Sequence, residues 1–391
     1  MIKISLRPNL VYPIYLIIST FLRKIVTILI SKLFSFKGSV IYTFLMFLGE
    51  LIAGFLFYRY QTKFIEEKTK QNVLNSNKLS SKISFIQKES KMMRPDNVIK
   101  YIFLIFMTGS FDFFEFILST YYISKFHKIS GTLQTRLGGI LMVFSSLLYW
   151  YLFKFPKFKH QILSIIILGL SIIILIISEF LFQTYDMILT VKNLALVIFF
   201  SILSHMCVAF NNTIEKYLID YNFLNPFLLL TFQGIIGIVF TIICGIFENP
   251  FPVLKNAYND NSSGMFILLL FMLLLYTLFG ALKNVYRMYT IMLFTPMNKH
   301  LADILVNPIY IIYYFSIGDD FKLDGESNYY YFFLNLFLLI IFDICELIFN
   351  EFLILLCCGL EFNTYSSITS RASINEEMNQ ETDEQDIDNN D

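Results

Sequence analysis

Long apolar runs separated by short polar segments follow one another along most of the chain. A helix needs about 20 apolar residues to span a hydrocarbon core about 30 Å thick. Runs that fit this length lie approximately at residues 9–33, 39–58, 100–123, 131–153, 162–183, 192–218, 224–247, 264–293, 296–317 and 329–357. Arg23 and Lys24 interrupt the first run, but splitting it would leave two pieces too short to span. The pattern therefore predicts an all-α integral membrane protein with about ten transmembrane helices.

The composition supports a lipid environment. Of the 391 residues 56% are hydrophobic and only 15% are charged, and the mean hydropathy is +0.62. A soluble domain of this length has a larger fraction of charged residues and a smaller fraction of hydrophobic ones. The formal net charge is zero, so no global electrostatic field favours binding to nucleic acid.

The distribution of Lys and Arg between the runs predicts the orientation in the membrane. The segment 59–100 holds ten basic residues and the short segment 154–159 holds three lysines, which places both segments on the cytosolic side. With ten spans, both termini then lie in the cytosol. We expect a transmembrane domain over 1–358 with a cytosolic loop at 61–97, followed by an acidic, disordered cytosolic tail at 359–391 that cannot bury a core.

The two halves of the chain, about 9–183 and 192–357, resemble each other. Residues 133–151 align without gaps on 297–315, which puts Arg136 opposite His300, and residues 47–49 align on 232–234. Halves of five spans each would have opposite orientations in the membrane, because five is an odd number. The alignment predicts two inverted five-helix repeats, an arrangement common among transporters.

Charged residues inside the predicted spans are the candidates for function. An ionised side chain at mid-bilayer costs about 2.5–3.5 kcal/mol on insertion scales, so it normally faces a partner or water. Asp112 and Glu115 share one face of a helix and need a cation. The candidate cations are Arg136 on the next helix, or Lys283 and Arg287, which lie one turn apart and have Asn284 beside them.

Other charges allow two interpretations each. Glu50 could couple a proton or clamp an amine, or it could pair with Arg23 or Lys24. Arg136 is the best single candidate for substrate contact because a guanidinium holds phosphate or carboxylate in two-point fashion, although anchoring Asp112 is an equally physical role. Lys299 and Asp303 are four residues apart and are expected to neutralise each other, either as a functional pair or as a structural one. His300 is a candidate because it aligns with Arg136 across the two halves. Glu215 and Lys216 are expected to extend their charged ends to the cytosolic surface.

Several motifs resemble the drug/metabolite transporter superfamily, and within it the F-type members of solute carrier family 35, which are related to nucleotide-sugar transporters. The motifs are Met46-Phe-Leu-Gly-Glu50, Asp112, Gln134 to Arg136, Glu215-Lys216-Tyr217, Asn225-Pro226, Gln233-Gly-Ile-Ile-Gly237 and Lys299 to Asp303. Two positions depart from the family pattern: Gln233 stands where the family has an acidic residue, and Val306 stands where it has a basic one. The resemblance implies two inverted repeats around a central cavity, to which Gln233 would contribute, and alternating access without a cofactor.

Three classes of function follow. The first is a secondary-active carrier of an organic metabolite across an endomembrane, such as a nucleotide-sugar-like or other phosphorylated anion. The second is a carrier of an amine or a neutral solute, and the third is a membrane enzyme or a scaffold that transports nothing. The sequence holds no HExxH or GxSxG motif and only four histidines, which disfavours an enzyme. The expected partners are the lipid bilayer and a small-molecule solute, with homodimerisation left open, and no metal or nucleic acid.

Overall fold

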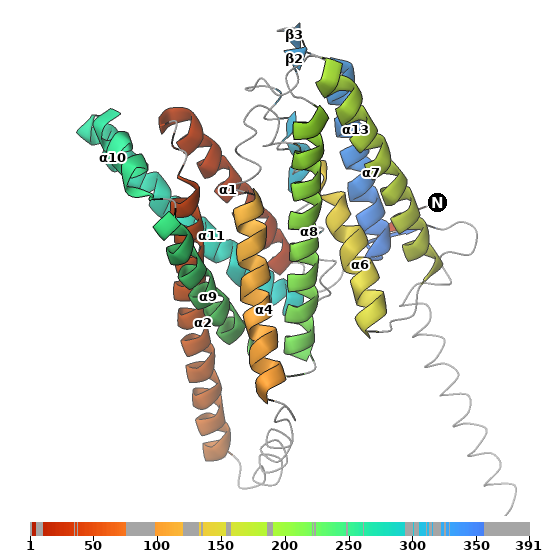
Figure 1. Cartoon of the computed structure of the whole chain (residues 1–391). Helices are drawn as coiled ribbons and strands as arrows, with labels where there is room; N and C mark the ends of the chain where they lie inside the picture. The colour runs from red at the N-terminus through yellow and green to blue at the C-terminus, as the bar shows by residue number, and fades with distance from the viewer. Residues whose placement is uncertain are drawn as a thin grey trace, which may run out of the picture.

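The chain is described by a computed structural model, shown in Figure 1. It describes the following residues: 2–4, 11–34, 36, 38–75, 98–119, 133, 136–153, 158–185, 191–220, 222, 224–247, 249–260, 262–293, 300, 305–309, 311–312, 315, 322–323, 326–327 and 329–355. The predicted acidic tail at 359–391 lies outside these residues, as do 76–97 of the predicted cytosolic loop.

Helices make up nearly all of the described structure. They are α1 (Val11–Phe34), α2 (Ser39–Asn75), α4 (Val98–Ile117), α6 (Gly139–Phe153), α7 (Lys159–Tyr185), α8 (Val191–Asp220), α9 (Pro226–Phe247), α10 (Phe251–Asp260), α11 (Ser263–Leu293) and α13 (Tyr329–Phe349). Four short strands form two antiparallel pairs: β1 (Ile2–Ile4) with β4 (Leu353–Leu355), and β2 (Lys322–Leu323) with β3 (Glu326–Ser327).

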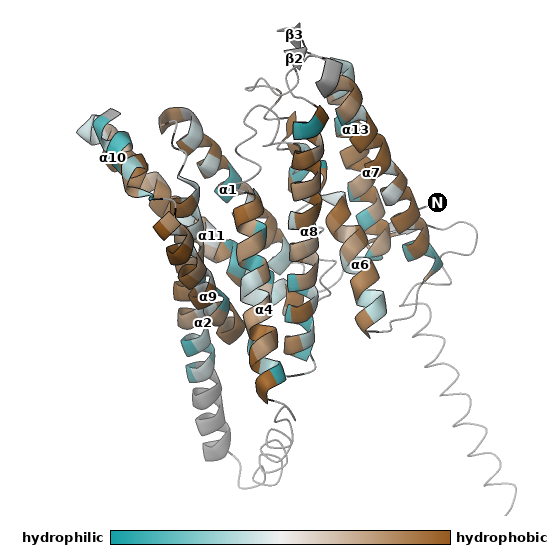
Figure 2. Cartoon of the chain, viewed as in Figure 1, coloured by the Kyte–Doolittle hydropathy of each residue, from teal (hydrophilic) through white to brown (hydrophobic). Residues whose placement is uncertain are grey.

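Seven helices in the described part of the chain are long and apolar enough to cross a membrane: α1, α2, α7, α8, α9, α11 and α13. Helix α6 is apolar but shorter, and α4 carries three charged residues within its 20. Large apolar side chains such as Ile166, Ile173 and Leu181 on α7 are more than half exposed. Figure 2 shows hydrophobic residues along most of these helices. Apolar surface on this scale needs lipid around it, so the protein is a multi-pass membrane protein.

The predicted spans match the described helices with three main differences, besides the start of α6 at Gly139, eight residues later than predicted. Helix α2 continues to Asn75, well past the predicted end at residue 58, because 61–75 contains good helix formers such as Glu, Lys and Gln and no Gly or Pro. Helix α10 was not predicted. It begins where Asn249 accepts a hydrogen bond from the Phe251 amide, with Pro252 in the first turn.

The third difference lies at the end of the last span, which was predicted to run to residue 357. Helix α13 ends at Phe349, and Glu351 takes a left-handed conformation with φ of 61°. The apolar residues that follow form β4, which pairs with β1 from the other end of the chain. An apolar run of this length cannot be assigned to helix or strand by composition alone. The predicted span at 296–317 lies mostly outside the described residues, which include one short helical piece at 305–309.

Two groups of helices lie side by side in Figure 1, with α4 and α8 between their outer members. In the first group α2 packs against α9 and α11, and α1 packs against α11. The backbones of α2 and α9 approach closely because glycines face them: a Cβ on Gly54 would lie 2.7 Å from the Thr231 amide nitrogen, and one on Gly234 would lie 2.6 Å from that of Leu51. Small residues on both helices therefore permit this close packing.

The second group consists of α6, α7, α8 and α13. A single apolar core joins them, and it includes the buried side chains of Leu168, Leu194, Leu339 and Phe342. Helix α7 packs along α13, and α6 packs against both α7 and α8. Each group therefore has its own core, while α4 contacts α8 on one side and α9 on the other and so connects them.

Candidate transport site

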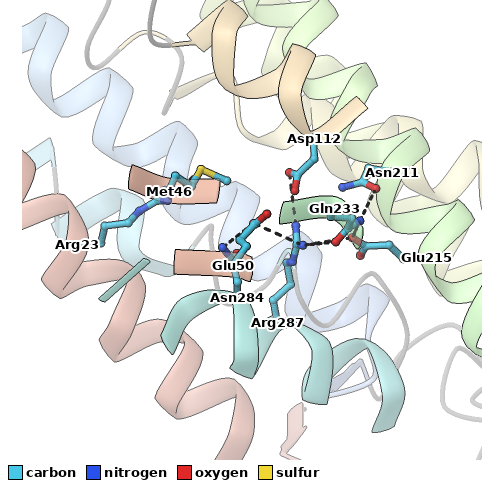
Figure 3. A network of polar contacts seen from close by, with 9 residues as sticks. All are labelled: Arg23, Met46, Glu50, Asp112, Asn211, Glu215, Gln233, Asn284 and Arg287. Atoms are coloured by element: carbon cyan, nitrogen blue, oxygen red, sulfur yellow. Dashed lines mark hydrogen bonds and ion pairs between the residues drawn. The ribbon is translucent and has the colours of Figure 1, made fainter. Parts of the chain in front are cut away.

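Arg287 of α11 lies at a point where side chains from five helices meet (Figure 3). Its guanidinium faces three carboxylates on three other helices. The nitrogen to oxygen distances are 3.3 Å to Glu215 of α8, 3.6 Å to Asp112 of α4 and 3.9 Å to Glu50 of α2. A fifth helix, α9, contributes Gln233, whose Oε1 accepts a hydrogen bond of 3.1 Å from Arg287. We refer to these residues, together with Asn211 and Asn284, as the Arg287 centre.

Amide side chains complete the Arg287 centre. Gln233 Nε2 donates to Glu215 Oε1 at 2.7 Å and to Asn211 Oδ1 at 3.3 Å. Asn284 Nδ2 donates to Glu50 Oε1 at 2.6 Å. The remaining oxygens, Oε2 of Glu50, Oδ2 of Asp112 and Oε2 of Glu215, are buried and accept no hydrogen bond from any described residue. Each carboxylate thus keeps one oxygen for a further donor.

Local structure fixes Gln233 and Glu50 in place. Asn225 caps α9: its Oδ1 accepts from the amides of Phe227 at 2.9 Å and Leu228 at 3.3 Å, while Pro226 occupies the first helical position. Gln233 follows two turns later, and its side chain reaches Glu215 of α8 and Arg287 of α11. Glu50 lies near the middle of the apolar part of α2, Ser39–Lys63, far from either end of that candidate span.

The Arg287 centre carries more negative than positive charge. All four charged side chains are buried, with no more than 5% of any residue exposed. Removing an ion from water costs several kcal/mol even after relaxation, unless a partner and hydrogen bonds compensate it. One guanidinium neutralises one of the three carboxylates, so the other two need protons or a bound cation. Among the described residues no group of His, Cys, Asp and Glu is arranged to hold a metal ion.

Arg136 belongs to a separate polar cluster in the second group of helices. It lies just before α6, is completely buried, and forms an ion pair with Glu179 of α7. Its Nη1 also donates to the Tyr331 hydroxyl at 2.7 Å and to Asn335 Oδ1 at 3.0 Å, both on α13. The predicted alternative, that Arg136 anchors Asp112, is not what the structure has, because Asp112 pairs with Arg287.

The structure brings together five of the residues singled out in the sequence: Glu50, Asp112, Gln233, Asn284 and Arg287. Glu115 and Lys283 are half-buried on the same helices as Asp112 and Arg287. His300 is buried with Nε2 2.8 Å from Ser145 Oγ on α6. Lys299 and Asp303 lie outside the described residues, so the proposed pair between them stays a prediction.

The basic residues of α1 do not pair with Glu50 as the alternative interpretation had it. Lys24 donates to Asn307 Oδ1 at 3.0 Å. Arg23 contacts Met46 Sδ at 4.0 Å and lies over the Tyr276 ring at 6.0 Å. Glu50 instead takes its partners from α11, namely Asn284 and Arg287.

Sequence reasoning missed two acids. Glu215 was expected to snorkel, but it is fully buried in the Arg287 centre because α8 continues five residues beyond it. Lys216 is buried too and donates to the Ile291 carbonyl at 2.9 Å. Glu179 was not singled out, nor were its neighbours Tyr331 and Asn335. A lone acid within the otherwise apolar stretch 162–183 was the available signal.

Comparison with known proteins does not assign the chain to a family. No protein-family model matches the chain, and no curated protein is significantly similar to it in sequence. The helices and their buried charges therefore carry the functional argument.

Proposed function

We propose that the protein is a secondary-active solute carrier, built from two inverted five-helix repeats, and that the Arg287 centre is its transport site. The observation that carries this proposal is a buried cluster of four charged side chains from four apolar helices, joined by Gln233 of a fifth. Charges inside the membrane are costly and mark solute or ion pathways. A scaffold needs no such cluster, and helix packing alone is achieved by the small residues between α2 and α9.

The packing of the helices supports two repeats. If each span of the first half corresponds to the span five places later, α1, α2, α4, α6 and α7 correspond to α8, α9, α11, the 296–317 segment and α13. The contact of α1 with α11 then corresponds to that of α8 with α4, and the contact of α2 with α11 to that of α9 with α4. The pairs α2–α9 and α7–α13 correspond to themselves, as a two-fold axis requires.

Helix α6 also packs extensively against α8. Under the same correspondence between the halves, this contact predicts that the 296–317 segment packs against α1. The hydrogen bond from Lys24 of α1 to Asn307 agrees with that prediction. Such two-fold relations between inverted halves, with a site near the bilayer midplane, are the general pattern of secondary transporters. The resemblance of the sequence motifs to solute carrier family 35 is in keeping with the same proposal.

The surroundings of the two arginines favour a cationic solute over an anionic one. Arg136, the candidate for holding phosphate or carboxylate, is already neutralised by Glu179. An anion there would have to displace a buried carboxylate and two further hydrogen bonds. The Arg287 centre has acidic groups in excess and would repel an anion. The amine carrier, one of the two carrier classes considered from the sequence, is therefore the better supported.

Uptake by proteoliposomes tests the proposal. The full chain would be assayed with a panel of organic cations, neutral solutes and phosphorylated anions. Arg287→Gln should abolish uptake of the transported solute, because it removes the guanidinium that the carboxylates of the Arg287 centre face. Arg59→Gln removes the same charge from an exposed position on α2 and should transport normally. Uptake that survives Arg287→Gln, or no uptake of any solute in the panel, would contradict the proposal.

A further inference from the structure

We propose that the Arg287 centre binds the ammonium group of an organic monocation in exchange for one proton. This inference rests on the proposed function, because a solute reaches a buried site only if the carrier opens to it. It names the class of solute and adds a stoichiometry that the proposed function does not require.

The charge count within the Arg287 centre is the first step. Among the residues that the structure describes, Arg287 is the cation within 4 Å of Glu50, Asp112 and Glu215, which leaves an excess of two carboxylates. Arg23 also interacts electrostatically with Glu50, and Glu115 with Arg287, and these two further residues carry opposite charges. The excess of two negative charges is therefore the same whether or not Arg23 and Glu115 are counted.

Other ionisable groups on the surrounding helices do not change this count. Lys216 of α8 is held by the Ile291 carbonyl and by Asp220, and Lys24 of α1 by Asn307. Lys283 of α11 is only half-buried. Helix α9 carries no acidic or basic side chain. The compensating positive charge must come from protons or from a ligand.

The hydrogen-bonding capacity of the Arg287 centre matches an ammonium group. Each of its three carboxylates has one buried oxygen that accepts nothing from the described residues. A primary ammonium has three N–H donors, as lysine has, and no acceptor. The amide nitrogen of Gln233 already donates to Asn211 and Glu215, and that of Asn284 donates to Glu50, so these two side chains orient the Glu215 and Glu50 carboxylates.

The proton balance follows from the excess. Without a ligand, two protons shared among the three carboxylates make the Arg287 centre neutral. When a monocation R–NH3+ binds, one proton leaves for the solvent and the centre stays neutral, so the exchange moves no net charge. By linkage, release of one proton on binding makes the apparent Kd fall tenfold for each unit by which the pH rises.

Calorimetric titration of the purified full chain tests the inference, with ethanolammonium and phenethylammonium chloride as probes. Titration in buffers of different ionisation enthalpy gives the number of protons released. We expect about one proton per cation bound and a tenfold fall in Kd per pH unit between pH 6 and pH 8, as the linkage requires. Binding of neither probe, or binding that releases no proton, would overturn the inference.

Variants that replace carboxylates of the Arg287 centre by neutral amides provide a second test. Glu50→Gln keeps an acceptor for Asn284 and should weaken binding of either probe at least tenfold. The double variant Glu50→Gln with Glu215→Gln leaves one carboxylate facing Arg287, and should bind no cation and release no proton. Asp343→Asn, which removes a half-buried carboxylate from α13, outside the Arg287 centre, is the matched control and should behave like the unaltered protein. A double variant that still releases a proton on binding would overturn the inference.

The two proposals fail in distinguishable ways. If a solute other than an ammonium compound is taken up in an Arg287-dependent manner, and ammonium probes release no proton, the carrier proposal stands and the exchange inference falls. If no solute moves in proteoliposomes, the carrier proposal itself fails.

Discussion

The ion pair of Arg136 and Glu179 can be dissected by a double-mutant cycle. Both side chains are at most 1% exposed, so solvent does not screen the pair. Arg136→Met leaves the Glu179 carboxylate buried without its cation, and Glu179→Met leaves the guanidinium in the same position. Breaking a buried pair by removing one partner costs about 3–5 kcal/mol. We expect each single variant to be destabilised by about that amount.

Replacing both residues removes both buried charges. Arg136→Met with Glu179→Met then loses mainly the hydrogen bonds from Arg136 to Tyr331 and Asn335. Interhelical hydrogen bonds in membranes contribute about 0.6 kcal/mol each, so the double variant should be only about 1–2 kcal/mol less stable than the unaltered protein.

Reversible unfolding in mixed micelles measures the three free energies of unfolding. The expected coupling energy is at least about 3 kcal/mol, because residues within one ion pair are strongly non-additive. A double variant destabilised by the sum of the two single effects would refute the reasoning. If uptake also persists in the double variant, Arg136 is a structural anchor and not a substrate contact.

Three further predictions concern the packing of the helices, the cap of α9 and the positions of the two termini. Gly234→Ala places a Cβ 2.6 Å from a backbone nitrogen of α2 and should cost about 1–3 kcal/mol in unfolding free energy, whereas Gly169→Ala, which meets nothing within 4 Å, should be neutral or stabilising. Asn225→Ala removes the cap of α9 and should lower the unfolding free energy by about 1 kcal/mol; an unchanged value would contradict the capping role. Because β1 pairs with β4, tags on the two termini should be digested by protease from the same side of the membrane, and protection of one tag alone would contradict this.

Much of the helical framework could be predicted from the apolar runs. Nine of the predicted spans correspond to described helices, because an apolar stretch of this length has to satisfy its backbone internally in lipid. The same reasoning failed where lipid does not decide the structure. Helix α2 continues through a polar segment on local helix propensity, and α10 is defined by capping at Asn249.

The candidate site was predictable in its members but not in its pairing. Asp112, Glu50 and Arg287 were recognisable as costly charges within apolar helices. Which acid meets which base depends on the order in which the helices pack, and spacing along one helix carries no such information. Arg136 therefore appeared equally suited to Asp112, although its partner is Glu179 of the next helix.

Glu215 shows a further limit of sequence reasoning. Its place near the predicted end of a span suggested exposure, but the helix runs on to Asp220 and the side chain faces Arg287. Neighbouring helices α9 and α11 cover it, and such coverage by distant segments cannot be read from the local pattern.

Access to the Arg287 centre from both sides of the membrane is the central claim, and thiol labelling tests it most directly. Asn284→Cys would be placed in a chain whose five native cysteines are replaced by alanine. Asn284 is only 2% exposed, so its side chain is shielded from solvent in this structure. Alternating access predicts that a membrane-impermeant thiol reagent labels Cys at this position when applied to either side of the membrane, and that a transported ammonium solute slows both reactions. Labelling from neither side, or from one side only, would contradict the account.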